Sequence, residues 1–194
     1  MLMTSRYGET EIDHDELQGL IPSLATRAEL DEFEQANIRE AMLWARKSRA
    51  VRKSLLTPAT LCELHDRMFR RVWTWAGKFR KTEKNIGVPV WKISSDLFNA
   101  CEDAKTWIEF NTFKPIEIAA RLHHRLVVIH PFPNGNGRWA RFAADLVLEQ
   151  ISEEQLSWGA NGRMASDEIR KSYIQALRKA DVLDFQPLIS FVVA

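Results

Sequence analysis

Apolar residues recur every three or four positions along most of the chain, which is the spacing of amphipathic helices. The first such pattern begins after Thr26 and Glu29, whose types and spacing form a capping box. The pattern predicts a helix that ends near Ser48, and its apolar face is expected to carry Leu30, Phe33, Asn37, Ala41 and Trp44.

Start signals at six further points predict six further helices. They stand at Thr57-Pro58, Ser95-Asp96, Pro115, Gly135, Ser166 and Phe185. The helix from Gly135 is expected to reach about Gln150, and the last helix to reach Val193. In the helix that follows Thr57, the inward positions are Leu61, Leu64, Met68 and Val72.

Residues 84–93 interrupt the helical pattern with β-branched residues, a glycine and a proline. This composition predicts a short β-hairpin or an extended edge. Residues 1–25 predict an irregular N-terminal leader, because Gly8, Gly19 and Pro22 break any pattern there. We therefore expect an all-α domain over residues 26–194 that carries one short β-hairpin.

Bulk composition limits the class of protein. The chain has 194 residues, of which 45% are hydrophobic, and this is enough for one domain with a sizeable core. A formal net charge of +1 gives no overall basic field for nucleic acid. No hydrophobic signal segment and no long apolar run are visible, so we expect a soluble cytoplasmic protein without membrane contact. Cys62 and Cys101 are too few for a disulfide framework and are expected as buried free thiols.

One basic cluster precedes the residues with the strongest chemical signal. It consists of Arg67, Arg70, Arg71, Lys78, Arg80, Lys81 and Lys84. A solvated helix face is the simpler interpretation of such a run. The cluster could also help to steer a nucleotide or an acidic target.

Residues 130–141, with the sequence HPFPNGNGRWAR, concentrate chemistry suited to an anion. Exposed backbone N–H groups at a helix start bind anions, and the helix dipole adds to this attraction. Gly135 and Gly137 remove side chains where a phosphate would approach the backbone. Arg138 and Arg141 share one face of the following helix, and guanidinium groups suit phosphate oxygens. His130, with an ordinary pKa near neutrality, is a candidate general base.

Two simpler interpretations compete with an anion site. Asn-Gly is a common turn dipeptide, and arginines in a first helical turn usually reach solvent. Positive charge is unfavourable at a helix N-terminus, however, which favours an anion there. A metal site built from His123, His124 and His130 is also conceivable. Adjacent histidines on a helix point about 100° apart, and no carboxylate stands at a zinc-motif spacing.

The stretch resembles the Fic/Doc family signature, His-Pro-Phe-x-(Asp/Glu)-Gly-Asn-Gly-Arg-x-x-Arg. It matches at every position except Asn134, where the family usually has a carboxylate. Ile129 before the stretch and an amphipathic helix after it also fit. Within the family, the chain is most similar to the subgroup called mobile mystery protein B. This further similarity involves residues 10–13, 34–38 and 75–87.

The resemblance implies a specific activity and a role for each residue. Fic proteins mostly transfer AMP from ATP to a Ser, Thr or Tyr hydroxyl of a target protein, so the chain is expected to be a protein adenylyltransferase. By resemblance, His130 would deprotonate the acceptor hydroxyl, and Phe132 would anchor the loop in the core. Gly135, Asn136 and Gly137 would surround the α- and β-phosphates. Arg138 and Arg141 would clamp the β- and γ-phosphates.

The resemblance also assigns the segment before the signature. Residues 84–93 would be the family's flap, in which Ile86, Gly87, Val88 and Val90 pair with a strand of the target. Such pairing positions the acceptor hydroxyl for attack.

Asn134 is the departure from the signature. In the family the acidic residue at this position helps to hold Mg²⁺, which prefers carboxylates and phosphate oxygens. An amide oxygen can bind Mg²⁺ without supplying charge, so Asn134 is expected as a weakened metal ligand. A different transfer remains open, either phosphorylation as in the Doc branch or another phosphate-linked transfer. A silent domain that binds nucleotide without turnover also remains open.

The resemblance raises the question of inhibition. Many Fic proteins carry a Ser/Thr-x-x-x-Glu-Gly/Asn motif whose glutamate pairs with the second signature arginine. The nearest match in the first helix, Ala36-Asn37, lacks the glutamate, and Glu34 is expected on a different helix face. Ser5 and Glu9 have the spacing, but Thr10 follows them. We therefore expect no built-in inhibitory glutamate, and restraint by a separate antitoxin-like protein becomes plausible.

Overall fold

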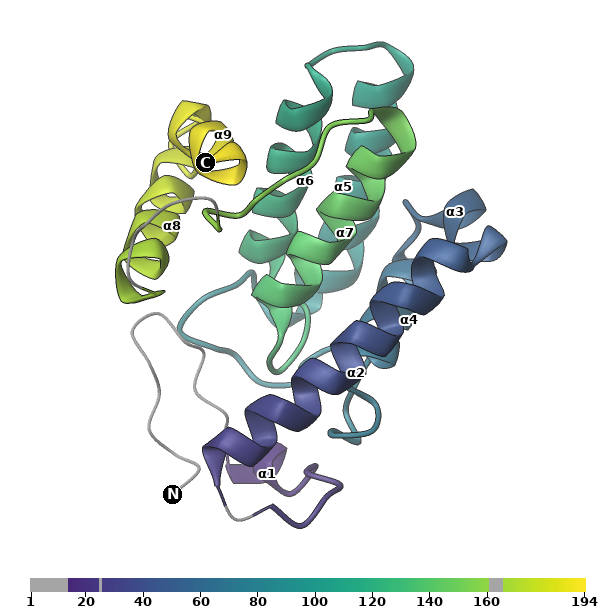
Figure 1. The fold of residues 1–194 in the computed structure, drawn as a ribbon, viewed down its shortest axis with the longest axis vertical. Coiled ribbons are helices and arrows are strands. Elements are labelled where there is room, and N and C mark those ends of the chain that lie inside the picture. The colour runs from purple at the N-terminus through teal and green to yellow at the C-terminus, as the bar shows by residue number, and fades with distance from the viewer. Residues whose placement is uncertain (1–13, 25, 161–165) are drawn as a thin grey trace.

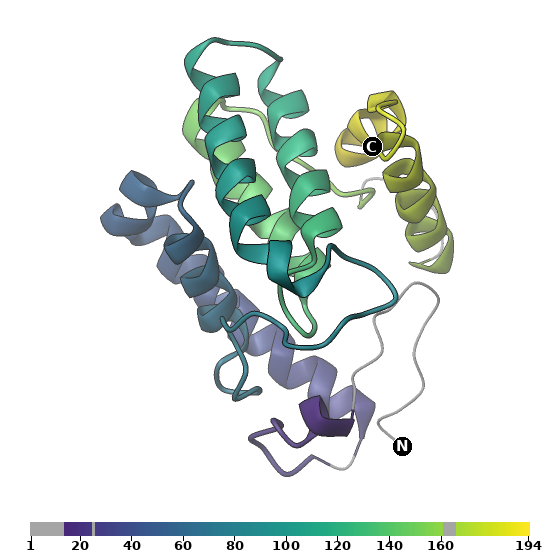
Figure 2. The ribbon, with the colours of Figure 1, turned by 180° about the vertical axis from the view of Figure 1, so that it is seen from behind.

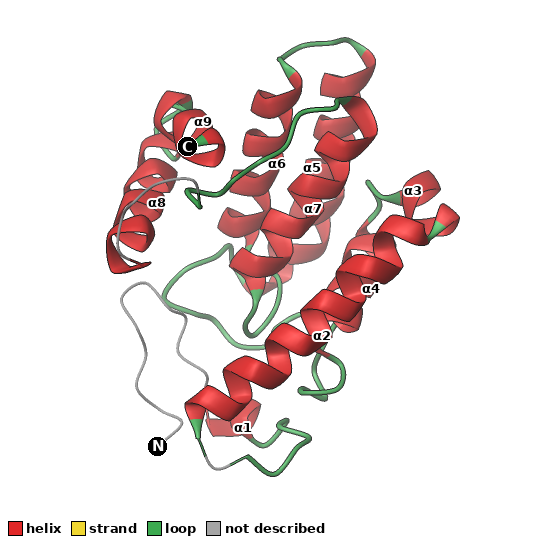
Figure 3. Cartoon of the chain, in the orientation of Figure 1, coloured by secondary structure: helices red, strands yellow, loops and turns green. Residues whose placement is uncertain are grey.

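The regular structure of the chain is helical throughout the part that the structure describes. A computed structural model describes residues 14–24, 26–160 and 166–194. Within these ranges it contains no strand, as Figure 3 shows. The all-α prediction is confirmed. The α-helices are α1 (His14–Leu17), α2 (Arg27–Lys47), α3 (Arg49–Ser54), α4 (Pro58–Phe69), α5 (Ile93–Glu109), α6 (Pro115–Ile129), α7 (Asn136–Ile151), α8 (Ser166–Ala180) and α9 (Gln186–Val193).

Most predicted helix starts agree with the structure. The capping box of α2 is present in both directions, since Glu29 N–H donates to the Thr26 hydroxyl and Thr26 N–H donates to the Glu29 carboxylate. Thr57 caps α4, and Pro115 is the first residue of α6. Ser166 does begin α8, but its side chain, and with it the predicted cap, lies outside what the structure describes.

Three local predictions were wrong. Helix α5 begins at Ile93 instead of after Ser95, because a 3₁₀ turn over Val90–Lys92 leads directly into it. Helix α3 was not predicted; Ser48 ends α2 and caps α3, accepting a hydrogen bond from Val51 N–H. Residues 14–24, expected to be irregular, contain α1 and a β-bridge between Leu20 and Trp73. Residues 1–13, with the Thr10 motif and the Ser5–Glu9 spacing, lie outside the described residues.

Three long helices form the centre of the molecule. Helices α5, α6 and α7 lie side by side, with α2 and α4 packed against them on one side and α8 and α9 on the other (Figures 1 and 2). The predicted inward residues Leu61, Leu64 and Met68 of α4, and Val72 just after it, are fully buried. Helices α8 and α9 share a smaller apolar cluster that reaches α6 through Ala120. The loop between α6 and α7 lies at one end of this bundle.

The buried face of helix α2 agrees with the prediction at Leu30, Asn37 and Ala41 and differs from it at two positions, where Glu34 and Ala45 are buried instead of Phe33 and Trp44. Phe33 is 47% exposed, whereas Glu34 beside it is 5% exposed. The buried face consists of Leu30, Glu34, Asn37, Ala41 and Ala45. The apolar pattern pointed to Phe33 because it assumes that a carboxylate avoids the interior. Glu34 is buried because it has two polar partners, which are described below.

The predicted hairpin at residues 84–93 is absent. Gly87 has a φ of +103°, and the segment ends in the 3₁₀ turn over Val90–Lys92. Its backbone groups bond to other parts of the chain instead of to a second strand. The carbonyl of Val88 accepts from the Arg80 guanidinium, and Val90 N–H donates to the Glu83 carboxylate. We call residues 82–92 the flap segment from here on.

The remaining bulk predictions are partly confirmed. Both cysteines are free thiols; Cys101 is buried, whereas Cys62 is only half-buried. Burial raises the pKa of Cys62 to about 11 and that of Cys101 to about 12. Among the described residues, no helix has the length and apolar character that crossing a membrane requires.

Candidate functional site

His130 ends α6 in a conformation that non-glycine residues rarely adopt. Its φ is 50° and its ψ is 59°, which is left-handed backbone. Its N–H donates to the Leu126 carbonyl at 3.2 Å, and its own carbonyl accepts from Arg80 Nε at 2.8 Å. These bonds fix the point at which the chain leaves α6. They also fix the direction in which the imidazole projects.

The imidazole of His130 is neutral at physiological pH. Burial, with the Arg80 charge as the second cause, lowers the pKa of His130 to about 4. The Val127 backbone acts in the opposite direction. A neutral imidazole carries its proton on one ring nitrogen, so the other ring nitrogen keeps its lone pair. A neutral imidazole with a lone pair is the state that a general base requires.

The loop from residue 131 to 136 is held by Asn136. Its side-chain oxygen accepts from Phe132 N–H at 3.0 Å, and its amide donates to the Phe132 carbonyl at 2.8 Å. Asn136 is buried, and Phe132 is fully buried in the core, where the resemblance placed it. The Asn136 side chain therefore shapes the loop, and only its backbone N–H remains for an anion at the helix start.

His65 of α4 is a site residue that the sequence analysis missed. Its Nδ1 accepts from Gly77 N–H at 3.0 Å, so Nε2 carries the proton and donates to the Asn134 carbonyl at 3.0 Å. Its ring stacks on Phe132 with centroids 3.7 Å apart. Burial lowers the pKa of His65 to about 3. The residue has no motif in the sequence, because its partners are backbone groups 12 and 69 residues away.

The fold requires glycine at one of the two signature positions, Gly135, and not at the other, Gly137, as far as the described residues show. Gly135 has a φ of +79°, and a Cβ there would lie 2.6 Å from the Phe69 ring, so the fold itself requires glycine. A Cβ at Gly137 would meet only the Tyr173 hydroxyl, at 4.0 Å, among the described residues. Nothing in the fold demands glycine inside the first turn of α7. Glycine costs about 1 kcal/mol relative to alanine at such a position.

Asn134 does not form a metal site with its neighbours. Its side-chain oxygen accepts from Gly135 N–H at 2.6 Å. The described residues contain no group of three or more His, Cys, Asp and Glu side chains that could hold a metal ion. One neutral amide oxygen that already accepts a hydrogen bond does not fit a Mg²⁺ held by the protein itself. Any Mg²⁺ would have to arrive on the phosphates of a nucleotide.

Arg138 is paired with Glu34 of α2. Its Nη1 lies 2.5 Å from Glu34 Oε2, and the side chains are 39% and 7% exposed. Glu34 Oε1 also accepts from Trp73 Nε1 at 2.7 Å. The expectation that Glu34 faces away from the signature is therefore wrong. The pairing involves the first signature arginine, whereas the resemblance implied the second.

Arg141 projects toward a different neighbour. Its guanidinium lies over the ring of Tyr173 at 4.5 Å and near the ring of Trp158 at 5.7 Å. Its Nε is buried and has no hydrogen-bond partner among the described residues. The contacts of Arg138 and Arg141 thus lie on opposite sides of the start of α7.

Arg80 holds the flap segment against the signature. Arg80, which is 2% exposed, donates its Nη1 to the Thr82 carbonyl and its Nη2 to the Val88 carbonyl. A Cβ at Gly87 would lie 2.8 Å from His130 Cβ. The Arg80 guanidinium is thus an internal support, not part of the solvated face that the basic cluster predicted.

The four residues of the flap segment that were predicted to pair with a target differ in exposure. Ile86 and Gly87 are exposed, whereas Val88 and Val90 pack against Ile93, Ala100 and Ile129. Lys84 forms a buried ion pair with Glu16 of α1 at 2.7 Å. The segment therefore offers a short exposed edge beside His130, held in place at both ends.

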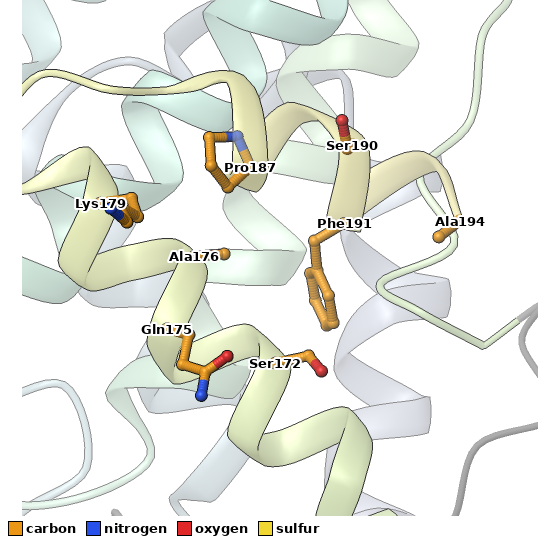
Figure 4. A pocket seen from close by; sticks show the side chains of 8 residues that line it. All are labelled: Ser172, Gln175, Ala176, Lys179, Pro187, Ser190, Phe191 and Ala194. Carbon is orange, nitrogen blue, oxygen red and sulfur yellow. The ribbon is translucent and has the colours of Figure 1, made fainter.

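The histidine cluster that would suggest a metal hydrolase does not form. His123 Nε2 bonds to the Tyr173 hydroxyl at 2.9 Å, and His124 Nε2 bonds to Asp181 at 2.8 Å. A cavity of about 440 Å³ lies between α8 and α9, but none of the candidate site residues lines it (Figure 4).

Comparisons with known proteins identify the family and the fold. A model of the Fic/DOC family matches residues 55–148. The solved BepC protein of Bartonella tribocorum, which has bound AMPPNP, superposes with a TM-score of 0.68. It is 18% identical to this chain, and the match covers 93% of this chain and 96% of that one. The chain belongs to the Fic/DOC family. No comparison tests the mobile mystery protein B subgroup, which stays a prediction.

Curated Fic relatives match a shorter stretch. "Protein adenylyltransferase fic-1" of Caenorhabditis elegans is 35% identical over 81 residues, which is 42% of this chain. "Protein adenylyltransferase Fic" of Nematostella vectensis is 37% identical over 78 residues, which is 40% of this chain. The matches span 15% and 17% of those two proteins, so this Fic/DOC chain corresponds to a small part of their length.

Proposed function

We propose that the chain is a protein adenylyltransferase that transfers AMP from ATP to a Ser, Thr or Tyr hydroxyl of a target protein. The observation that supports it most is the open space at Gly137. The first turn of α7 carries a destabilising glycine that none of the described neighbours requires. It lies at the positive end of a helix, seven residues after a neutral buried histidine. An approaching phosphate accounts for that glycine.

Phosphate binding would satisfy groups that the free protein leaves poorly paired. Backbone N–H groups at the start of α7, including those of Asn136 and Gly137, would point at the α- and β-phosphates. The buried Nε of Arg141 has no partner among the described residues, and an oxygen of the phosphate chain would supply one. Arg138 would join only by leaving Glu34. ATP would arrive with Mg²⁺ on its phosphates.

The chemistry assigned to this site is proton transfer and positioning. His130, neutral with a lone pair, would take the proton of the acceptor hydroxyl as its oxygen attacks the α-phosphorus and pyrophosphate leaves. The helix dipole and arginines would offset charge on the phosphates in the transition state. The exposed edge at Ile86 and Gly87, with Val88 and Val90 behind it, would hold the target segment beside His130.

The name of one relative supports a second nucleotide donor. "Uridine 5'-monophosphate transferase" of Xanthomonas campestris is 57% identical over 35 residues, although these are 18% of this chain and 6% of that protein. A UMP donor would use the same phosphate cradle and the same base. A Doc-like kinase would instead leave the γ-phosphate on the target.

Labelled donors distinguish these activities. The chain is incubated with a cell extract, Mg²⁺ and one of three donors: α-labelled ATP, γ-labelled ATP or α-labelled UTP. Protein-bound label from α-labelled ATP alone is the expected result. Label from γ-labelled ATP would indicate a kinase, label from UTP a uridylyltransferase, and no label despite ATP binding a silent domain. The control is His130→Ala, which should abolish transfer and leave ATP affinity within about twofold, because the base does not bind the phosphates.

A restraining partner is part of the same proposal. An antitoxin-like protein that covers Arg138 or the exposed edge at Ile86 would block the nucleotide or the target. Copurification of a small protein that lowers the labelling of extract proteins is the expected sign of it.

A further inference from the structure

Tyr173 of α8 is a buried phenol that the proposed mechanism does not use. It lies outside residues 55–148, the part that the family model matches. Its hydroxyl has three polar or glycine neighbours, which are Arg141, His123 and Gly137. Burial raises the pKa of Tyr173, so the phenol keeps its proton.

The ring and the hydroxyl of Tyr173 have different partners. The Arg141 guanidinium lies over the ring, with its central carbon 4.5 Å from the ring centroid. The hydroxyl lies 2.9 Å from His123 Nε2 and donates its proton to that nitrogen. His123 can accept it because burial, with the Arg141 charge as the second cause, lowers the pKa of His123 to about 3 and keeps the ring neutral. Tyr173 is therefore anchored to His123 on one side and contacts Arg141 on the other.

The same phenol borders the open space at the start of α7. A Cβ at Gly137 would lie 4.0 Å from the Tyr173 oxygen, and no other described side chain comes as near to it. The Tyr173 ring meanwhile lies 4.5 Å from the Arg141 guanidinium carbon. Arg141 is thus held on the side of α7 where Gly137 leaves room for a phosphate.

We infer that Tyr173 is a positioning residue for the phosphate site: its ring, anchored to His123 through the hydroxyl, holds the Arg141 guanidinium beside Gly137. The inference rests on the proposed function, since it assigns Arg141 to a phosphate. Trp158 supports Arg141 from a second direction, and its own Nε1 donates to Asp145 at 2.8 Å. A preoriented guanidinium loses less side-chain freedom when it binds, and this favours affinity.

A double-mutant cycle on ATP affinity tests the inference. Calorimetry with Mg²⁺-ATP compares the wild-type chain with Tyr173→Phe, Arg141→Ala and the double variant. Arg141→Ala is expected to weaken binding about thirtyfold. Tyr173→Phe should weaken it about fivefold, because the hydrogen bond that anchors the ring to His123 is lost. Adding Tyr173→Phe to Arg141→Ala should change affinity less than twofold, since the phenol acts through the arginine.

The control is Ser172→Ala, which removes a hydroxyl from the residue just before Tyr173 in the same helix. Ser172 lines the cavity between α8 and α9 (Figure 4) and should leave ATP affinity unchanged. Melting temperatures without nucleotide separate a purely structural effect. A structural role would lower stability and weaken binding equally with and without Arg141.

Two further variants test the hydrogen bond between His123 and Tyr173 if Tyr173→Phe folds poorly. His123→Gln keeps an acceptor for the phenol proton and should keep wild-type affinity, whereas His123→Leu should weaken ATP binding about threefold. Unchanged or tighter binding by Tyr173→Phe, or equal loss in both backgrounds, would overturn the inference. If Arg141→Ala itself binds ATP normally, the proposed function fails at this residue instead.

Discussion

Glu34 of α2 and Arg138 of α7 are joined by an ion pair of 2.5 Å, 104 residues apart in the chain. The carboxylate is buried and also accepts from Trp73, so it is fixed, while the guanidinium is partly exposed. A phosphate that binds Arg138 must compete with a carboxylate of the same charge sign. In the proposed function, the pair would therefore oppose the binding of a nucleotide.

Replacing Glu34 by Gln should tighten ATP binding. The amide oxygen still accepts from Trp73, but the competing charge is removed, and a partly exposed pair of this kind is worth about 1 kcal/mol, or about fivefold in affinity. Calorimetry on Glu34→Gln, with the exposed Glu32→Gln of the same helix as control, measures this. Equal affinities for Glu34→Gln and the wild-type chain would show that the pair does not restrain the site.

Replacing Asn134 by Asp should make nucleotide binding depend more strongly on Mg²⁺. The carboxylate can still accept from Gly135 N–H, and it adds the charge that Mg²⁺ prefers. The ratio of ATP affinities with and without Mg²⁺ is expected to rise about tenfold relative to the wild-type chain. If that ratio stays the same in Asn134→Asp, residue 134 does not face the metal.

His65 should matter for stability as much as for the site. His65→Phe preserves stacking on Phe132 but leaves Gly77 N–H and the Asn134 carbonyl without their partner. Unpaired buried polar groups cost about 1–3 kcal/mol each, so the free energy of unfolding should fall by about 2–4 kcal/mol. Urea unfolding measures it. The comparison is His124→Phe, which loses a hydrogen bond to the largely exposed Asp181; a smaller loss for His65→Phe than for His124→Phe would contradict the assignment.

Stability should decrease as the pH falls below about 6.5. The pKa values of His65 and His123 are lowered to about 3 and that of His130 to about 4, from 6.5, chiefly by burial. Between pH 6.5 and 4 the unfolded chain binds protons that the folded chain does not, and each histidine then costs about 1.4 kcal/mol per pH unit.

Asp145 acts in the opposite sense, because burial raises its pKa to about 6 and the folded state binds the extra proton. The combined effect of the three histidines on the free energy of unfolding exceeds that of the one aspartate. Urea unfolding at pH 7.5, 6 and 5 should show the decrease, and His130→Gln should lessen it. A free energy of unfolding that is constant over this range would mean that these histidines are not held neutral.

Much of the fold was predictable from the sequence, because local signals control it. The Thr26 and Thr57 caps and Pro115 act within three or four residues, and periodicity identified the α4 core. The errors arose where distant parts of the chain decide. Glu34 is buried because Trp73 and Arg138 pair with it, and the flap segment is irregular because Arg80 takes its carbonyls.

The candidate site shows the same division. The signature identified His130, Gly137 and the arginines, whose chemistry is contained in one short stretch. His65 and Tyr173 were missed because each acts through partners from other helices. The side chain of Asn136 bonds to Phe132 within the loop, so only its backbone N–H is left for the predicted role at the phosphates, which stays a prediction.

ATP binding by Gly137→Ala is the most direct test of a phosphate site at the start of α7. A methyl group at residue 137 fits the protein without nucleotide and favours a helix. The free energy of unfolding without nucleotide should therefore equal that of the wild-type chain or exceed it by up to about 1 kcal/mol. ATP affinity should fall at least about thirtyfold, because the methyl group occupies the space assigned to the phosphate. Undiminished ATP affinity in a stable Gly137→Ala chain would contradict the account.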